Sequence, residues 1–173
     1  MQLTTKLLKL ILEELARKLM RISFDLDDTL ICREHVPSEP NRIPFFLNPW
    51  INEPLRLGSC TLMKQLKQYG CEIWIYTSSY RSPCSIRLWL RFYGIHVAGV
   101  INQTVHNAYL RRNSGYDRAS KNPKAFGIDL HVDDSEGVRL EGKKYGFEVI
   151  VISPEDRNWN LAVIEAVVRQ LNP

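Results

Sequence analysis

The chain has 173 residues, of which 45% are hydrophobic and 24% are charged, and its formal net charge is +4. This length is enough to bury the core of one domain, and the composition excludes intrinsic disorder, collagen-like repeats and disulfide miniproteins. The mild positive surplus suits an acidic or phosphorylated ligand but does not by itself indicate a nucleic-acid-binding protein. The four cysteines form no C-x-x-C pair, which favours reduced thiols and a cytoplasmic protein. They are Cys32, Cys60, Cys71 and Cys84.

Residues 1–20 are predicted to form an amphipathic N-terminal helix, outside a main domain that covers residues 21–173. Apolar residues recur at helical spacing and charged residues lie between them. The longest unbroken apolar run spans only residues 10–12, too short for a signal peptide or a membrane span. We expect the apolar stripe to pack on its own domain rather than on a membrane, because its mixed charge is a poor membrane signal. Homo-oligomerisation through this helix stays open. The stripe consists of Leu8, Ile11, Leu12, Leu15 and Leu19.

Strands and helices are predicted to alternate along the rest of the chain. Helices are expected between Ser82-Pro83 and Gly94, with capping signals at both ends, and from near Asn158 to the C-terminus. The last helix is expected to bury one face, made of Leu161, Ile164, Val167 and Leu171. Two further helices are expected at 61–69 and 136–145, and short apolar runs predict strands at 21–24, 72–76, 97–101, 128–132 and 148–152.

This alternation predicts an α/β fold, a Rossmann-like three-layer sandwich with a five-stranded parallel sheet covered on both faces. In such sheets ligands bind beyond the C-terminal ends of the strands. The residues that follow each strand are therefore the place to look for chemistry.

Two stretches interrupt the alternation. Residues 31–58 hold five of the nine prolines, which deny a long helix or a central strand, so we expect a small flap insertion. Its aromatic residues Phe45, Phe46 and Trp50 could form the floor of a substrate site or simply bury the loop. Residues 104–124 are polar and basic, and we expect a second long loop there. Its basic residues are Arg111, Arg112, Arg118, Lys121 and Lys124.

Acidic and hydroxyl residues follow three of the predicted strands. The first strand runs into residues 25–30, with the sequence DLDDTL, and the second ends in Thr77-Ser78-Ser79. The fourth ends in Asp133-Asp134-Ser135, with two lysines just upstream. Because parallel strands end at one edge of their sheet, we expect these side chains to form one site.

These residue types suit phosphoryl transfer, which needs a nucleophile, a cation, donors for the phosphoryl oxygens and an acid for the leaving group. Asp25 can serve as the nucleophile and form an aspartyl-phosphate. Asp27, two residues on in an extended segment, projects to the same side and can act as general acid and base. Mg²⁺ prefers hard oxygen ligands, which Asp25 and Asp133 supply, with Asp134 as a second ligand or a supporting residue. Thr77 would donate to the phosphoryl oxygens.

The three strand-end groups, together with the two lysines upstream of the last one, resemble the four motifs of the haloacid-dehalogenase-like hydrolase superfamily over about residues 21–153. The family pattern matches Asp25, Asp27, Thr29, Leu30, Thr77, Lys121 or Lys124, and Asp133 with Asp134. The resemblance implies a magnesium-dependent phosphatase in which the backbone carbonyl of Asp27 is a further metal ligand. Its dehalogenase branch lacks the second acid, so Asp27 favours a phosphatase.

The remaining site residues are assigned by position. Lys121 is preferred as the catalytic lysine because it sits in Lys-Asn-Pro, which is similar to the family's lysine motif. Thr29, Ser78 and Lys124 are expected to bind substrate. His131, on the fourth strand, is interpreted as a structural histidine rather than a ligand.

The short insertion after the first motif predicts a small or absent cap and a rather open site. We expect the partner to be a phosphorylated substrate, a small molecule rather than a macromolecule, and the sequence shows no specific nucleic-acid motif. The alternative function is a catalytically weak or inactive module that binds phosphate or a partner. A receiver-type phosphoacceptor is disfavoured, because its lysine follows the acid pair rather than preceding it.

Overall fold

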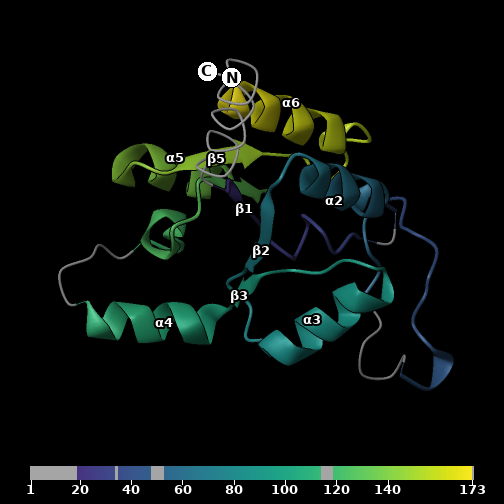
Figure 1. Ribbon diagram of the computed structural model, residues 1–173. Helices are drawn as coiled ribbons and strands as arrows, with labels where there is room; N and C mark the ends of the chain where they lie inside the picture. Colours follow the sequence, from purple (N-terminus) through teal and green to yellow (C-terminus); the bar gives the residue numbers. More distant parts are fainter. Residues whose placement is uncertain (1–18, 34, 48–52, 114–118, 173) are drawn as a thin grey trace, which may run out of the picture.

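The computed structural model describes residues 19–33, 35–47, 53–113 and 119–172 (Figure 1). The expected helix at residues 1–20 and the aromatic residue Trp50 lie outside these ranges, apart from the last two residues of the helix.

A five-stranded parallel sheet forms the centre of the fold, as the sequence predicts. Its strands lie in the order β3-β2-β1-β4-β5, and each pair of neighbours is parallel. The central position of β1 places the loop that follows it between the loops that follow β2 and β4. The strands are β1 (Arg21–Phe24), β2 (Glu72–Tyr76), β3 (Gly99–Ile101), β4 (Leu130–Asp133) and β5 (Glu148–Val151).

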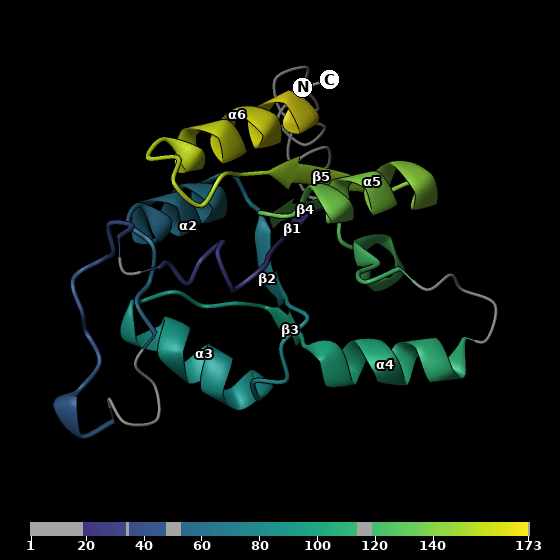
Figure 2. The ribbon, with the colours of Figure 1, turned by 180° about the vertical axis from the view of Figure 1, so that it is seen from behind.

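Helices cover both faces of the sheet and complete the three layers (Figures 1 and 2). One face carries α2 (Ser59–Gln68), α3 (Pro83–Phe92) and α6 (Trp159–Leu171). The other carries α4 (Gln103–Arg112), α5 (Glu136–Tyr145) and the short 3₁₀ helix η2 (Pro123–Phe126).

The core follows from strands that are buried on both sides. In β2, Ile73 and Ile75 join the large apolar cluster under α2, α3 and α6, whereas Tyr76 belongs to a smaller cluster with Ile101 and Ile128. Each fully buried aliphatic side chain of this kind contributes about 1.5–3 kcal/mol to folding. The sheet is therefore a rigid support for the loops at its C-terminal edge.

The helix signals in the sequence are confirmed for α3 and α5. The side chain of Ser82 accepts a hydrogen bond from the Ser85 backbone N–H at 3.0 Å, and Gly146 ends α5 in the left-handed conformation. The expected buried face of α6 is wrong in part. Leu161 is 55% exposed, and the buried positions are Val163 and Val167, one and two turns after the buried Trp159.

The expected long loop over residues 104–124 is wrong, because residues 104–112 belong to helix α4. Asn102 caps this helix by accepting a hydrogen bond from the Val105 backbone N–H at 3.0 Å. The helix contacts the sheet at the edge strand β3 and fully buries only His106. Such a helix needs few apolar residues, so its sequence is as polar as that of a loop. Arg111 and Arg112 lie exposed in its last turn.

The described part of residues 31–58 holds no strand and no helix beyond the single turn η1 (Phe45–Leu47), as its prolines predict. Isolated bridges pair Ile31 with Leu55 and Ser38 with Arg56. Figure 1 shows η1 away from the rest of the molecule. Phe45 and Phe46 are 84% and 60% exposed and pack edge-to-face on each other. Both side chains therefore lie open to solvent and do not bury the loop.

Arg56 fixes the end of this insertion to the loop after β5. Its guanidinium is buried, donates to the carbonyl oxygens of Ser153 and Asp156 at 2.7 and 2.8 Å, and lies over the ring of Trp159. This contact holds the two loops together beside the C-terminal edge of the sheet.

A substitution at Gly99, on the edge strand β3, tests how tightly this strand packs against Trp74 of β2. A Cβ atom added here would lie 2.0 Å from ring atoms of Trp74, so Gly99→Ala forces the indole to move. We expect this change to lower the free energy of unfolding by about 1–3 kcal/mol, measured by urea denaturation. The control is Gly137→Ala in the first turn of α5, where the nearest atom is the movable Ser135 hydroxyl at 3.2 Å. Equal stability of the two variants would contradict the expectation.

Candidate active site

The chain turns sharply just after the central strand. The carbonyl of Leu26 accepts hydrogen bonds from three successive backbone N–H groups, those of Thr29, Leu30 and Ile31, at 3.3, 2.9 and 2.7 Å. Asp28 adopts a positive φ of 58° within this turn, and Arg33 pairs with its carboxylate at 2.6 Å. The turn leaves Asp25 buried at the end of β1.

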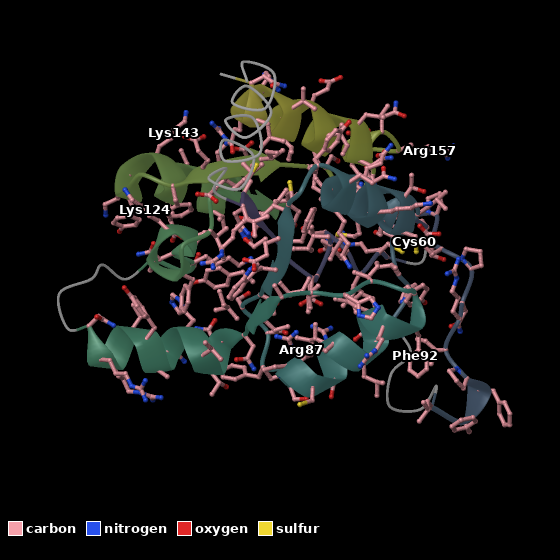
Figure 3. All side chains as sticks on the ribbon, in the orientation of Figure 1. Cys60, Arg87, Phe92, Lys124, Lys143 and Arg157 are labelled. Carbon is pink, nitrogen blue, oxygen red and sulfur yellow. The ribbon has the colours of Figure 1, made fainter. Side chains whose placement is uncertain are left out.

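Lys121 lies against the acidic residues at this edge. Its Nζ is 2.9 Å from Asp25 Oδ1 and 2.6 Å from Asp133 Oδ2, and the whole residue is 3% exposed. Lys124 is exposed, and its Nζ would lie 3.7 Å from a Cβ added at Gly146, the residue that ends α5. Figure 3 shows Lys124 near α5. The structure therefore brings Lys121 to the candidate site and places Lys124 at the surface beside the end of α5, a position that disfavours the expected contact between Lys124 and a substrate.

Three carboxylates form a candidate cation site. One oxygen each of Asp25, Asp133 and Asp134 lie within 4.8 Å of one another. The Asp27 carboxylate is not in this group, because it turns towards Arg81. In this geometry Asp27 could bind a metal only through its backbone carbonyl, which is the ligand that the family resemblance implies. An all-carboxylate donor set suits a hard cation such as Mg²⁺.

The charges at this site are crowded. Burial, with the neighbouring Asp133 carboxylate, raises the pKa of Asp25 above its ordinary value, although Lys121 opposes the shift. Burial and Asp133 likewise raise the pKa of Asp134. Burial would also raise the pKa of Asp133, but the His131 hydrogen bond and the Lys121 charge hold it well below its ordinary value. Three carboxylates and one lysine carry a net negative charge, and a divalent cation would reduce the repulsion between the carboxylates.

Asp133 is fixed by hydrogen bonds on both of its oxygens. Its Oδ1 accepts from the Ser135 backbone N–H at 2.9 Å, and its Oδ2 is 2.9 Å from His131 Nε2. The other ring nitrogen of His131 is 2.8 Å from the Ser23 hydroxyl. Burial lowers the pKa of His131, so the network assigns a neutral ring that donates to Asp133 and accepts from Ser23. The interpretation of His131 as a structural histidine agrees with this geometry.

The hydroxyl residues of the sequence motifs differ in what they can reach. Thr77 is buried beside β3, and its Oγ1 accepts from the Ser79 backbone N–H at 3.1 Å, which leaves its own proton to donate. Ser78 is exposed on the same loop. Thr29 is fully buried, and its hydroxyl has no hydrogen-bond partner among the described residues. That burial disfavours the expected contact between Thr29 and a substrate.

Arg81 is a site residue that the sequence reasoning missed. Its Nη1 donates to Asp27 Oδ2 at 2.8 Å, and its Nη2 donates to Glu53 Oε1 at 3.0 Å. Arg81 thus joins the carboxylate after β1 to the end of the 31–58 insertion. Its place four residues after Thr77, in the loop that follows β2, was the available signal.

The loop that carries Lys121 is held by a buried polar chain. The Tyr76 hydroxyl accepts from the Asn122 backbone N–H at 2.8 Å and donates to Nδ1 of His106 at 2.6 Å. Burial lowers the pKa of His106, which keeps the ring neutral and able to accept. A side chain on β2 and another on α4 therefore position the residue next to Lys121.

Tyr76→Phe is expected to lower the free energy of unfolding by about 1–3 kcal/mol, because it leaves a partly buried N–H and a buried ring nitrogen without partners. Urea denaturation measures the loss. Tyr80→Phe is the control, since Tyr80 is 71% exposed, and it should change stability by less than about 0.5 kcal/mol. A Tyr76 variant as stable as this control would show that the chain of hydrogen bonds is not needed.

No protein-family model and no curated protein matches this sequence. Its fold does match solved structures. A HAD-superfamily hydrolase of subfamily IA from Geobacter sulfurreducens has a TM-score of 0.51 at 14% identity, over 86% of this chain and 99% of that chain. An uncharacterised protein from Listeria monocytogenes serotype 4b has a TM-score of 0.53 at 15% identity, over 88% and 98%.

A chain of the Pnkp1/Rnl/Hen1 complex has a TM-score of 0.53 at 14% identity, covering 81% of this chain and 48% of that chain, so the present chain spans about half of it. With the strand order described above, these matches show a haloacid-dehalogenase-like (HAD-like) fold, as the sequence motifs predict. At these identities the likeness concerns the fold alone.

Two further observations bear on the expectations from composition. No helix among the described residues combines the length and the apolar character that a membrane span requires. All four cysteines are free thiols.

Proposed function

We propose that the chain is a magnesium-dependent phosphatase that hydrolyses phosphate monoesters through an aspartyl-phosphate on Asp25. One observation carries the proposal: a buried carboxylate at the end of the central strand lies 2.9 Å from a buried lysine and beside two further carboxylates that suit a cation. The HAD-like fold supports a hydrolase. The mild positive charge of the chain and the absence of a specific nucleic-acid motif favour a small phosphorylated molecule as substrate.

In the first half of the proposed reaction, an oxygen of the Asp25 carboxylate attacks the phosphorus atom. The bond from phosphorus to the leaving oxygen breaks, and Asp27 gives its proton to that oxygen, so that an alcohol departs. Lys121 and the Thr77 hydroxyl stabilise the negative charge on the phosphoryl oxygens. Mg²⁺ held by Asp25, Asp133 and Asp134 would neutralise part of the same charge.

In the second half, Asp27 takes a proton from a water molecule, whose oxygen attacks the phosphorus atom. The bond to Asp25 breaks and inorganic phosphate leaves, with the Asp25 carboxylate restored. The Asp27 side chain is 51% exposed and is oriented by Arg81, so both the leaving group and water can reach it. A halide would need no such proton, which favours phosphate esters over haloacids as substrates.

The test is phosphate release from phenyl phosphate by the 173-residue chain, with Mg²⁺ and with EDTA. We expect release only with the metal. A folded protein that released no phosphate from phenyl phosphate or from a panel of small phosphate esters would contradict the proposal. That outcome would favour the alternative, a module with this fold that binds phosphate or a partner without turnover.

A further inference from the structure

A cavity of about 310 Å³ lies beside the candidate active site, between the turn after β1 and the N-terminal half of α3. Its volume is at the lower end of the range for small-molecule sites. Its apolar wall comes from Leu26, Ile31, Ile86 and Trp89, and its polar rim includes Arg81. The mechanism proposed above makes no use of this cavity.

The side chain of Arg81 connects the cavity to Asp27, the residue that protonates the leaving oxygen in the proposed mechanism. Arg81 lines the cavity, and its Nη1 is 2.8 Å from Asp27 Oδ2. A carboxyl that protonates the leaving oxygen must lie within hydrogen-bond distance of it. The leaving group therefore begins at Asp27, and the cavity is the neighbouring space that can hold its remaining atoms.

The walls select an apolar ligand. Leu26, Ile31 and Ile86 are aliphatic, and Trp89 is fixed by a hydrogen bond of 2.9 Å from its Nε1 to the Glu53 carbonyl. A fixed indole offers a rigid surface for a flat group without the entropy cost of ordering it. An apolar cavity of roughly 150 Å³ already holds benzene, so one aromatic ring fits here.

The rim disfavours a second negative charge. Arg81 is the only cation among the described residues that line the cavity, and it is already paired with two carboxylates. Its Nη1 bonds to Asp27, and its Nε and Nη2 bond to Glu53 at 3.2 and 3.0 Å. Even with Asp27 protonated, as the first half of the proposed reaction requires, the Glu53 carboxylate balances the guanidinium, so the rim offers no net positive charge to an anionic leaving group.

We propose that this cavity binds the leaving group of the substrate, and that this group is compact, uncharged and largely apolar, about the size of one aromatic ring. The proposal rests on the proposed function. When the bond from phosphorus to oxygen breaks and Asp27 supplies the proton, the product held in the cavity is a neutral alcohol. We therefore expect the fit of the leaving group in the cavity to determine the KM of each substrate.

The first experiment reduces the volume of the cavity by placing a larger side chain at its edge. Ser85 is exposed on α3 and lines the mouth, so Ser85→Phe places a ring there without changing the core. We expect KM for phenyl phosphate to rise about tenfold or more, and KM for methyl phosphate to stay within about twofold. Leu88→Phe, one turn later on the same helix and outside the lining, is the matched control and should change neither value. Identical KM values for the two variants with phenyl phosphate would overturn the proposal.

The second experiment uses only the wild-type protein, so it does not depend on whether Ser85→Phe folds. It compares 4-carbamoylphenyl phosphate with 4-carboxyphenyl phosphate, two esters of similar size that differ by one negative charge. We expect KM to be about tenfold lower for the uncharged ester. An equal or lower KM for the charged ester would overturn the assignment.

A third measurement separates this proposal from the proposed function. Saturation-transfer NMR detects binding of the product alcohol 4-hydroxybenzamide without any turnover. Binding to the wild type and to Leu88→Phe, but not to Ser85→Phe, supports the cavity even if no ester is hydrolysed. Phosphatase activity with no difference between the two variants in binding or in KM overturns the cavity proposal and leaves the proposed function standing.

Discussion

Replacing Asp25 with asparagine is expected to reduce phosphate release by a factor of at least about 10⁴, the scale seen when a nucleophile is removed from an enzyme. An amide oxygen is a poor nucleophile, and the phosphorylated intermediate cannot form on it. The fold should survive, because asparagine has nearly the same volume as aspartate. The substitution also removes a carboxylate that burial and the nearby Asp133 destabilise, as the raised pKa of Asp25 indicates.

The matched control is Asp28→Asn. Asp28 lies three residues away, pairs with Arg33 at the surface and is outside the three-carboxylate cluster. It has a positive φ, which asparagine tolerates well. Phosphate release and thermal unfolding would be measured for both variants with saturating Mg²⁺. Near-normal release from Asp25→Asn would exclude Asp25 as the nucleophile, and equal losses in both variants would indicate a general disturbance of the turn.

The strand-end residues are the part of the site that sequence reasoning predicts best. Asp25 and Asp133 follow buried apolar runs, and a parallel sheet must bring the ends of such runs to one edge. Local sequence therefore specifies both the strand and the position of its last polar residue. The same argument places Thr77 at this edge of the sheet, directly after β2, the neighbour of β1.

Other features depend on contacts between distant parts of the chain, which local patterns do not encode. The Lys-Asn-Pro sequence favours Lys121 by its resemblance to the family motif, but no local pattern shows that its side chain reaches Asp25, about a hundred residues earlier in the chain. The bond between Arg81 and Asp27 crosses between two loops in the same way. The sequence pattern does not predict helix α4, because this helix lies at the sheet edge and needs only one fully buried residue.

The role of Lys121 leads to the second large effect, on stability in the absence of metal. Lys121→Ala removes the cation that faces Asp25 and Asp133 and leaves two buried carboxylates beside each other. Breaking a buried ion pair by removing one partner costs about 3–5 kcal/mol. Lys124→Ala removes an exposed lysine and should cost less than about 0.5 kcal/mol. Urea denaturation in EDTA would measure both free energies of unfolding.

A double variant tests whether charge is the cause. If the loss in Lys121→Ala comes from uncompensated carboxylates, then adding Asp25→Asn removes one of them and should restore part of the stability. The gain in stability from Asp25→Asn should therefore be larger in the Lys121→Ala background than in the wild type, a non-additive result expected only for groups in contact. Equal small losses for the two lysine variants would mean that Lys121 is not the lysine of this site. An equal effect of Asp25→Asn in the two backgrounds would mean that Lys121 stabilises the protein by packing rather than through its charge.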